Sequence, residues 1–267
     1  MKKIRQRVCQ WWILGLVIQT LVLVAHAHEH EVIRKPIRNT IQNEDRTLEI
    51  VLPKAYDPES EEGYEVVYLI DAGWHMDLVP YVHEIARQAG QASPAIFVGI
   101  PNIEVNGESQ RNRDLLPAQD ADKFLEFITK DVIAHVEKHY RTNDRRILYG
   151  HSYGGIFATY AFLTHPEIFD AYLSMDAPYQ GAKRMVLITA KERLGKFPCA
   201  GKSLWIVGIE GGQEKRGYNE LKQLLEAQAP QELVWKMHFY PNETHQSVCL
   251  KGAYDGFRFL NQKQRNR

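Results

Sequence analysis

The chain has 267 residues, of which 44% are hydrophobic and 25% charged, and its 33 basic residues balance 33 acidic ones. These values are typical of a soluble globular protein that can bury a sizeable core, arranged as one large α/β domain or two small ones. Nothing in the charge suggests a nucleic-acid partner.

The N-terminal residues predict an export signal. Residues 1–7 are rich in lysine and arginine, an apolar run of about 15 residues follows at 11–25, and Ala25-His26-Ala27 is a small-x-small cleavage site. The run is short for a membrane span, and an uncleaved anchor is the alternative. We expect residues 1–27 to be a signal peptide. The mature chain, 28–267, would be periplasmic or secreted, without membrane contact after cleavage, and would carry 29 basic and 33 acidic residues, a net charge of −4.

Apolar runs and helical patterns alternate along the rest of the chain. The apolar or alternating runs predict strands at 47–53, 65–71, 95–100, 147–149, 171–175, 204–209 and 234–240, and residues 33–42 are expected to form an entry segment or an edge strand. Helical periodicity, ragged in one segment, predicts helices at 76–90, 120–140, 153–163, 179–196, 217–229 and 247–260, with a long loop at 101–119. This alternation predicts an α/β fold with a mostly parallel central sheet and helices on both faces.

One junction between a strand and a helix organises the chain. The motif Gly150-x-Ser152-x-Gly154 separates the strand at 147–149 from the helical pattern that begins at Tyr153. A sharp turn there exposes the serine Oγ above the sheet, and glycines two residues before and after avoid clashes. We predict a nucleophile elbow, with Ser152 as nucleophile and the Tyr153 N–H as one oxyanion donor. The alternative is a simple glycine-rich joint.

A serine becomes a good nucleophile only when a base takes its proton. His245 is the candidate base because it lies in the loop after the last predicted strand. The orienting acid should follow the strand at 204–209, where Glu210 comes first and Glu214 second. We favour Glu210; Asp176, after the preceding strand, is a further candidate, and a serine–histidine dyad remains open.

The second oxyanion donor should come from the loop after an early strand. Gly73 and Trp74 occupy that place, and the Trp74 ring would either wall the acyl pocket or simply pack in the core. The neighbouring His75 could also line the pocket. His151 lies inside the elbow, where its ring should point away from the Ser152 Oγ.

The elbow and several further motifs together resemble the esterase D-like branch of the α/β-hydrolases. That branch includes S-formylglutathione hydrolases, feruloyl esterases, mycolyltransferases and siderophore esterases. The matching segments are 67–74, 97–102, 111–117, 146–155, 165–169 and 243–248, in this order over most of the predicted mature chain. The resemblance implies an α/β-hydrolase fold, Ser152 as nucleophile, His245 as base, and Arg113-Asp114 as a structural or pocket-rim pair. It implies no metal and no cofactor. Some siderophore esterases of this branch work with a serine–histidine dyad, which keeps the identity of the acid open.

We therefore expect an exported serine esterase that acts on a small-molecule ester through an acyl-enzyme. Export excludes the cytosolic thioester role that much of this branch serves. A general carboxylesterase and a feruloyl or acyl-sugar esterase are the alternatives. From another class, a non-catalytic binding module on the same fold is the alternative. The oligomeric state and acyl length are not predicted.

Basic residues near the predicted pocket mouth suggest an anionic substrate. They are Arg111, Arg113, Lys183 and Arg184, on a mature chain that is net acidic. A ferric catecholate siderophore trilactone would suit them, with Trp74 and Tyr179 stacked on its rings. The alternative is that these cations only pair with acidic neighbours.

Two cysteines remain after the predicted cleavage, in a compartment that permits disulfides. Cys199 precedes the strand at 204–209, whereas Cys249 follows the His245 loop, so the two should lie at opposite ends of the sheet. A strand of that length separates the ends by about 20 Å, and a disulfide needs Cα atoms within roughly 7 Å. The topology favours two free thiols.

Overall fold

The computed structural model describes residues 31–102, 108–210 and 215–265, so the predicted signal peptide and its cleavage site lie outside the described residues. The chain divides into two compact units, Met1–Glu31 and Val32–Arg267, and every described helix and strand belongs to the second unit. Among the described residues, no helix is both long enough and apolar enough to cross a membrane.

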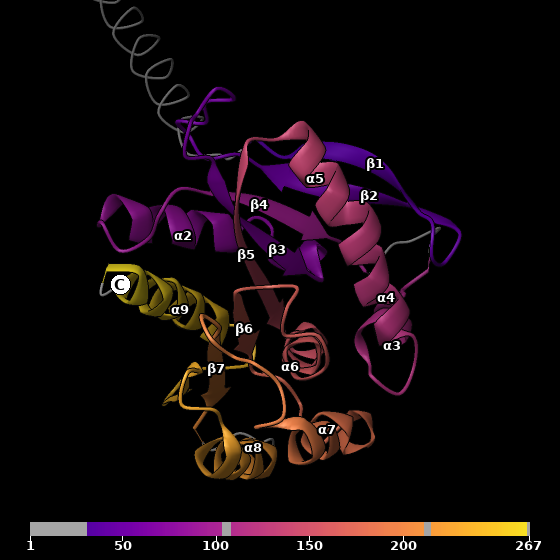
Figure 1. Ribbon diagram of the computed structural model, residues 1–267, viewed down its shortest axis with the longest axis vertical. Helices are drawn as coiled ribbons and strands as arrows, with labels where there is room; N and C mark the ends of the chain where they lie inside the picture. The colour runs from indigo at the N-terminus through magenta and orange to yellow at the C-terminus, as the bar shows by residue number, and fades with distance from the viewer. Residues whose placement is uncertain (1–30, 103–107, 211–214, 266–267) are drawn as a thin grey trace, which may run out of the picture. The chain divides into compact units, whose positions relative to one another are not determined.

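An eight-stranded sheet forms the middle of the Val32–Arg267 unit (Figure 1). Its strands lie in the spatial order β1-β2-β4-β3-β5-β6-β7-β8. The pairs β1–β2 and β2–β4 are antiparallel, and all other pairs are parallel, as predicted. The strands are β1 (Ile33–Asn39), β2 (Glu44–Val51), β3 (Tyr64–Ile70), β4 (Ala95–Ile100), β5 (Thr142–His151), β6 (Ala171–Met175), β7 (Ser203–Ile209) and β8 (Val234–Tyr240). The parallel strands therefore end at one common edge, where the loops that carry the candidate site residues begin.

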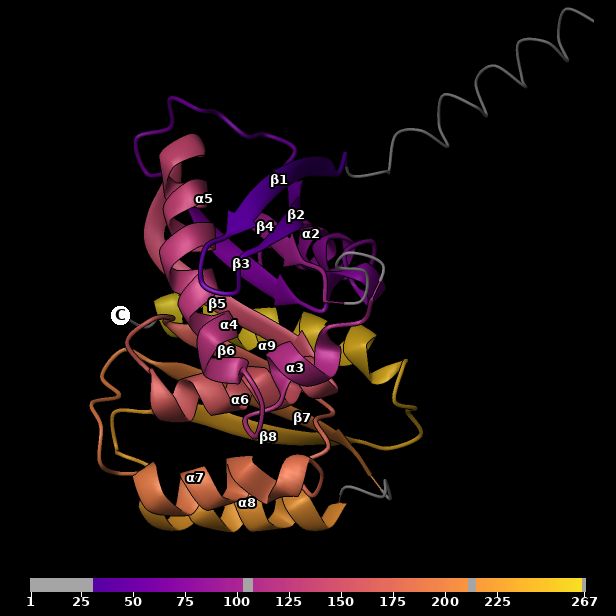
Figure 2. The ribbon, with the colours of Figure 1, turned by 90° about the vertical axis from the view of Figure 1, so that its right-hand side faces the viewer.

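Helices cover both faces of this sheet (Figures 1 and 2). On one face, α2 (Val79–Gln88) packs beside α9 (Val248–Arg265). The other face carries α4 (Ala121–Phe127), α5 (Ala134–His139), α6 (Tyr153–Thr164), α7 (Met185–Arg193) and α8 (Lys215–Gln228). The predicted helix at 120–140 is continuous but has a π-helical middle, Ile128–Ile133, between α4 and α5. A short helix that the sequence did not indicate, α3 (Arg111–Leu115), interrupts the loop after β4.

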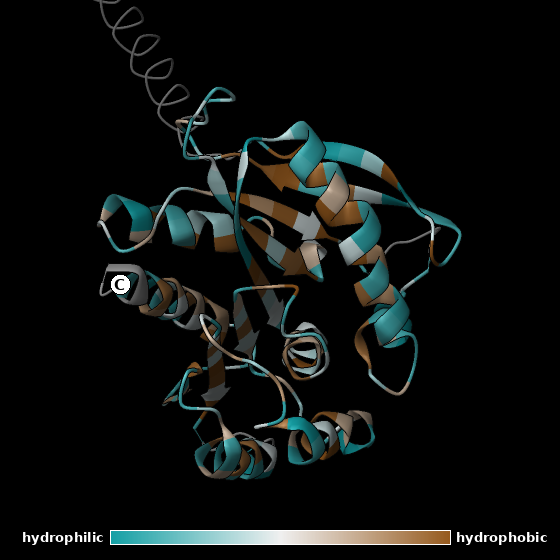
Figure 3. Ribbon diagram, viewed as in Figure 1, coloured by the Kyte–Doolittle hydropathy of each residue, from teal (hydrophilic) through white to brown (hydrophobic). Residues whose placement is uncertain are grey.

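The strand β3 shows why a continuous apolar run predicts a strand covered on both sides. All of its residues are buried, and they alternate between two hydrophobic clusters because successive side chains point to opposite faces. Val67 and Leu69 pack with α2 and α9, whereas Tyr68 and Ile70 pack under α4 and α6. Figure 3 shows the same arrangement, with hydrophobic strands in the middle and hydrophilic outer sides on the helices.

The two described cysteines are free, as predicted, and both are buried. Cys199 belongs to the cluster on the α6 face, and Cys249 belongs to the cluster on the α9 face. The sheet therefore lies between the two thiols.

Candidate active site

Ser152 lies at the turn between β5 and α6, and its backbone has the strained conformation that the motif predicts. Its φ and ψ angles are 57° and −118°, a region that a non-glycine residue adopts only when its surroundings enforce it. The Ser152 N–H donates a hydrogen bond of 2.8 Å to the carbonyl oxygen of Met175 at the end of β6. This bond fixes the turn to the neighbouring strand.

The glycines of the elbow differ in how much space a side chain would have at each position. A Cβ atom on Gly150 would lie 2.0 Å from the carbonyl oxygen of Gly154, which the fold cannot accommodate. A Cβ on Gly154 would meet its nearest neighbour, an Ile70 atom, at an ordinary 3.6 Å. Gly155 has less space, because a Cβ atom there would lie 3.0 Å from atoms of Ala177 and Ser174. The predicted steric need therefore holds for Gly150 and, unexpectedly, for Gly155 more than for Gly154.

His245 lies in the loop after β8, and the carboxylate that it meets is Asp176. The His245 Nδ1–H donates a hydrogen bond of 2.7 Å to Asp176 Oδ2. Asp176 directly follows β6, is 6% exposed and has a φ of 41°. This bond leaves the lone pair of His245 on Nε2, the nitrogen that a general base would use. Among the described residues, neither Ser152 Oγ nor any other group is hydrogen-bonded to that nitrogen, and contacts of this kind often tighten only when substrate is bound.

The sequence ranked two glutamates above Asp176 as the acid, and the structure arranges them differently. Glu210 follows β7 as expected, but its side chain is exposed and the hydrogen bond from the His245 ring goes to Asp176. Glu214 lies outside the described residues. At this site the carboxylate next to the imidazole follows β6, the strand adjacent to β5, one strand earlier than expected, and it keeps the chain order of serine, acid and histidine.

Two further histidines form a chain of hydrogen bonds that ends on the His245 loop. His151 Nε2 lies 2.7 Å from the backbone carbonyl oxygen of His245, so it must carry the proton and donate. The Nδ1 of a neutral His151 then accepts from His75 Nε2, which lies 3.0 Å away. The rings of His151 and His245 are also close, with centroids 4.3 Å apart.

Burial keeps both of these histidines uncharged. It lowers the pKa of His151 to about 3 and the pKa of His75 to about 4, and neighbouring positive groups lower both pKa values further. The sequence noted both residues but assigned neither a role in holding His245. The sequence did contain a signal, because His151 ends the apolar strand β5, His75 lies shortly after the apolar strand β3, and these strands are adjacent.

The predicted oxyanion donors occupy the expected loops. Tyr153 is the first residue of α6, and Gly73 and Trp74 lie in a short 3-10 helix, Ala72–Trp74, directly after β3. N–H groups at the start of a helix have no partner within it, which leaves them available to an oxyanion. The side chain of Trp74 is outside the described part of the structure, so its predicted contact with substrate stays a prediction.

Tyr179 lies in the core instead of at a pocket mouth. It is 1% exposed, and its hydroxyl is hydrogen-bonded at 2.8 Å to both Thr159 and Ser174. Its ring packs edge-to-face on Tyr218. A ring in this position is not accessible for stacking on a substrate, and its polar group is already satisfied.

Arg113 is held by two acids rather than presented to solvent. Its guanidinium bonds Asp114 at 2.8 Å and Glu44 at 2.7 Å. Asp114 is fully buried and also binds Arg46 and Asn102. This network matches the structural role expected of the Arg113-Asp114 pair.

The other predicted rim cations are largely paired as well. Arg184 forms an ion pair with Glu220 at 2.6 Å. Arg111 forms one with the buried Asp71 at 2.7 Å, and its guanidinium also lies 5.3 Å from the centre of the Tyr153 ring. Burial raises the pKa of Asp71, and the charge of Arg111 offsets part of that shift. Lys183 is exposed. Arg111 is thus the rim cation placed directly beside the elbow.

Comparisons with known proteins find a matching family and several similar proteins. The model of the family described as "Putative esterase" matches residues 39–236. Among curated proteins, the ferri-bacillibactin esterase BesA of Bacillus subtilis is 29% identical over 156 residues, which cover 50% of this chain and 54% of BesA. The siderophore enterobactin esterase of Emericella nidulans is 30% identical over 130 residues, which cover 40% of this chain and 43% of that protein. The chain thus matches about half the length of these curated relatives.

Solved structures extend the likeness to the whole fold. An IroE-like serine hydrolase from Shewanella oneidensis superposes with a TM-score of 0.76 at 30% identity, covering 87% of this chain and 80% of that one. The enterobactin esterase FES of Shigella flexneri gives a TM-score of 0.70 at 22% identity, covering 89% of this chain and 61% of FES. The α/β-hydrolase fold expected from the sequence is confirmed.

Proposed function

The chain belongs to the esterase family whose model it matches, and on that premise we propose that it hydrolyses carboxylic esters through an acyl-enzyme on Ser152. The observation that supports this proposal most is the position of Ser152 on a strained elbow, at the same sheet edge as the hydrogen-bonded pair of His245 and Asp176.

The proposed reaction has two halves. In the first, His245 Nε2 takes the proton of the Ser152 hydroxyl as the serine oxygen attacks the ester carbonyl. His245 then gives this proton to the oxygen of the leaving alcohol as the C–O bond breaks, and the acyl group stays on Ser152. Water then repeats the sequence on the acyl-enzyme and releases the acid. Asp176 orients the imidazole and stabilises its cation, and the N–H groups of Tyr153 and of the Gly73-Trp74 turn bind the oxyanion.

A siderophore ester is the proposed natural substrate class. Support comes from the similar proteins, because BesA is named a ferri-bacillibactin esterase, and the Emericella protein and FES are named enterobactin esterases. Arg111, next to Tyr153, would contribute a positive charge at the site for such an anion. The ion pairs of Arg113 and Arg184 favour the second candidate, a general carboxylesterase, because they reduce the free positive charge at the rim.

One set of assays separates these functions. Purified protein and Ser152→Ala are compared on short p-nitrophenyl esters, and then on a ferric catecholate trilactone. Serine-dependent turnover of either substrate supports an esterase, and a higher kcat/KM on the trilactone supports the siderophore function. Turnover of the short ester but not of the trilactone would support the general carboxylesterase. Absence of serine-dependent turnover on every ester would favour the non-catalytic binding module.

Export remains part of the proposal because of the basic residues and apolar run before residue 28. Expression of the full chain in a Gram-negative host, followed by fractionation and N-terminal sequencing, tests it. A product that starts at His28 in the periplasmic fraction is expected, and an unprocessed chain retained with the membranes would contradict it.

A further inference from the structure

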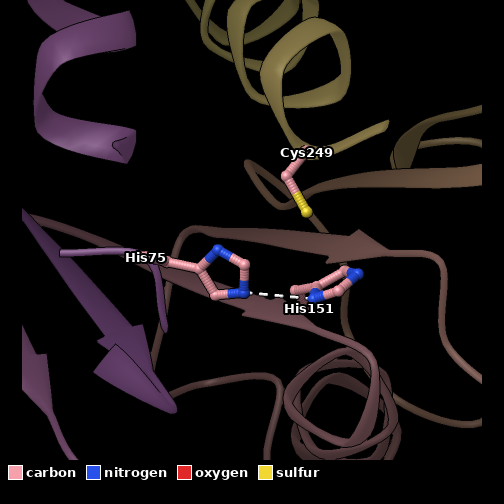
Figure 4. A group of neighbouring side chains, drawn as sticks. All are labelled: His75, His151 and Cys249. Carbon is pink, nitrogen blue, oxygen red and sulfur yellow. Dashed lines mark hydrogen bonds between the residues drawn. The ribbon is translucent and has the colours of Figure 1, made fainter. Parts of the chain in front are cut away.

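Three side chains that can bind a metal ion meet beneath the His245 loop. They are His75, after the 3-10 helix that follows β3, His151, at the end of β5, and Cys249, in the first turn of α9 (Figure 4). One potential ligand atom from each lies within 4.8 Å of the other two. The histidines are each 7% exposed and the cysteine is fully buried. Nitrogen and sulfur donors gathered in this way are typical of zinc sites.

The hydrogen bonds of the two histidines leave ligand atoms directed into this cluster. His151 uses Nε2 to bind the backbone oxygen of His245, so its Nδ1 faces His75. Metal-ligating histidines commonly make such a bond to a carbonyl group with their outer nitrogen. His75 Nδ1 is buried and has no hydrogen-bond partner among the described residues. The free lone pair on this nitrogen can take up the ring proton of His75 when Nε2 binds a metal ion.

The distances are close to those of an occupied site. Zinc lies about 2.1 Å from nitrogen and 2.3 Å from sulfur, so tetrahedral ligands lie roughly 3.3 to 3.6 Å from one another. His75 Nε2 and His151 Nδ1 are 3.0 Å apart, and the Cys249 sulfur points toward the two rings (Figure 4). Rotation about the Cys249 side-chain bond and an adjustment of about 1 Å would complete three corners of a tetrahedron.

We propose that His75, His151 and Cys249 form a binding site for a zinc ion, with the fourth position left to water. Binding forms a Zn–S bond as the thiol proton of Cys249 leaves to solvent. His75 binds through the nitrogen facing His151, and its proton moves to the other ring nitrogen. No electrons are transferred.

Occupancy of this site would act on the neighbouring imidazole. A zinc ion with one thiolate leaves a net positive charge beside the group that must become cationic during ester hydrolysis. Like charges at this range disfavour each other in a buried site. Zinc is therefore expected to lower esterase turnover, but the site itself is tested by binding, which does not depend on the proposed activity.

Two metal titrations of the chelator-treated protein test the site. Calorimetry with Zn²⁺ should give one ion per chain, and Co²⁺ should give the near-ultraviolet charge-transfer band of a cobalt–thiolate bond. Cys249→Ser should lose that band and weaken zinc binding by at least about tenfold, and His75→Gln should weaken it similarly. Cys199→Ser removes the second buried thiol among the described residues and serves as the matched control, with wild-type binding expected.

Three outcomes would overturn the proposal. One is equal zinc affinity in Cys249→Ser and wild type, and another is a cobalt–thiolate band that survives in Cys249→Ser. The third is binding that disappears in His245→Gln while Cys249→Ser keeps it, because the ion would then sit on the candidate catalytic base. A further measurement needs no variant: zinc should slow alkylation of Cys249 during partial unfolding in urea by more than it slows alkylation of Cys199, and equal rates for Cys249 with and without zinc also contradict the site.

Discussion

His151 donates a hydrogen bond from Nε2 to the backbone carbonyl oxygen of His245, over 2.7 Å, although 94 residues separate the two in the chain. The residue next to the candidate nucleophile thus holds the loop of the candidate base. Because burial keeps the pKa of His151 at about 3, this donor keeps the same tautomer across the pH range in which serine esterases work.

Replacing His151 by leucine should lower kcat by about 10- to 100-fold, which corresponds to about 1.4 to 2.7 kcal/mol, the loss expected for one buried hydrogen bond. KM should stay within about threefold, because the substrate does not need this bond for binding. His151→Gln keeps an N–H donor and should recover part of the rate. The exposed His165 provides the control His165→Gln, with wild-type kinetics. An unchanged kcat in His151→Leu would remove His151 from the positioning of His245.

Asp176→Asn should lower kcat by about three orders of magnitude, because the amide cannot stabilise the imidazolium and favours the wrong tautomer. Glu210→Gln is the matched control, since Glu210 follows the neighbouring strand β7 but is exposed and has no hydrogen bond to His245. Its kcat should equal that of wild type. Steady-state kinetics on a p-nitrophenyl ester decide whether Asp176 or Glu210 is the acid. Near-wild-type rates in both variants would indicate a serine–histidine dyad.

The contrast between Asp176 and Glu210 shows which features of the site could be predicted from the sequence and which could not. Met175 and Val207 are register partners in adjacent parallel strands, so both carboxylates were correctly expected at the same sheet edge. Which carboxylate binds His245 depends on the path of the loop after β8, and a loop has no periodic residue pattern from which its path could be predicted. The buried strands were predictable because their runs of apolar residues have a direct physical cause.

The misplaced Tyr179 has a similar origin. Its position in a ragged segment near the predicted pocket mouth suggested stacking on a substrate, yet its hydroxyl is satisfied by Thr159 and Ser174, which lie 20 and 5 residues earlier in the chain. The π-helical middle of the long helix also leaves no mark on the apolar periodicity. Single-residue environments of this kind are set by tertiary contacts, not by local pattern.

Gly150→Ala should destabilise the protein by more than about 3 kcal/mol, since its Cβ would lie 2.0 Å from a backbone oxygen that side-chain motion cannot move. Gly154→Ala is the matched control within the same motif. Its Cβ would make only a 3.6 Å contact, and alanine favours the helix that begins there, so its stability should equal or exceed that of wild type. Urea unfolding of both variants measures the difference, and equal stabilities would show that the elbow does not depend on Gly150.

The pair of Glu84 and Arg87 on α2 should stabilise the protein in a defined pH range. Hydrogen bonds from Arg87, at 2.6 and 2.8 Å, and from Gln88 hold the pKa of Glu84 at about 2, below its ordinary 4.5. A lowered folded-state pKa means that the unfolded chain binds the proton more readily. The stabilisation is therefore complete above pH 4.5 and is lost as the pH falls toward 2.

Glu84→Gln should thus be less stable than wild type at pH 7, by on the order of 2 kcal/mol, and this difference should shrink steadily below about pH 4.5. Urea unfolding at about pH 7, 5, 4 and 3 measures it. Glu126→Gln is the matched control, because Glu126 pairs with Lys130 on an exposed helix face and pairs of that kind contribute about 0 to 1 kcal/mol. A difference for Glu84→Gln that stays constant over this pH range would contradict the lowered pKa, since a loss of packing alone does not depend on protonation.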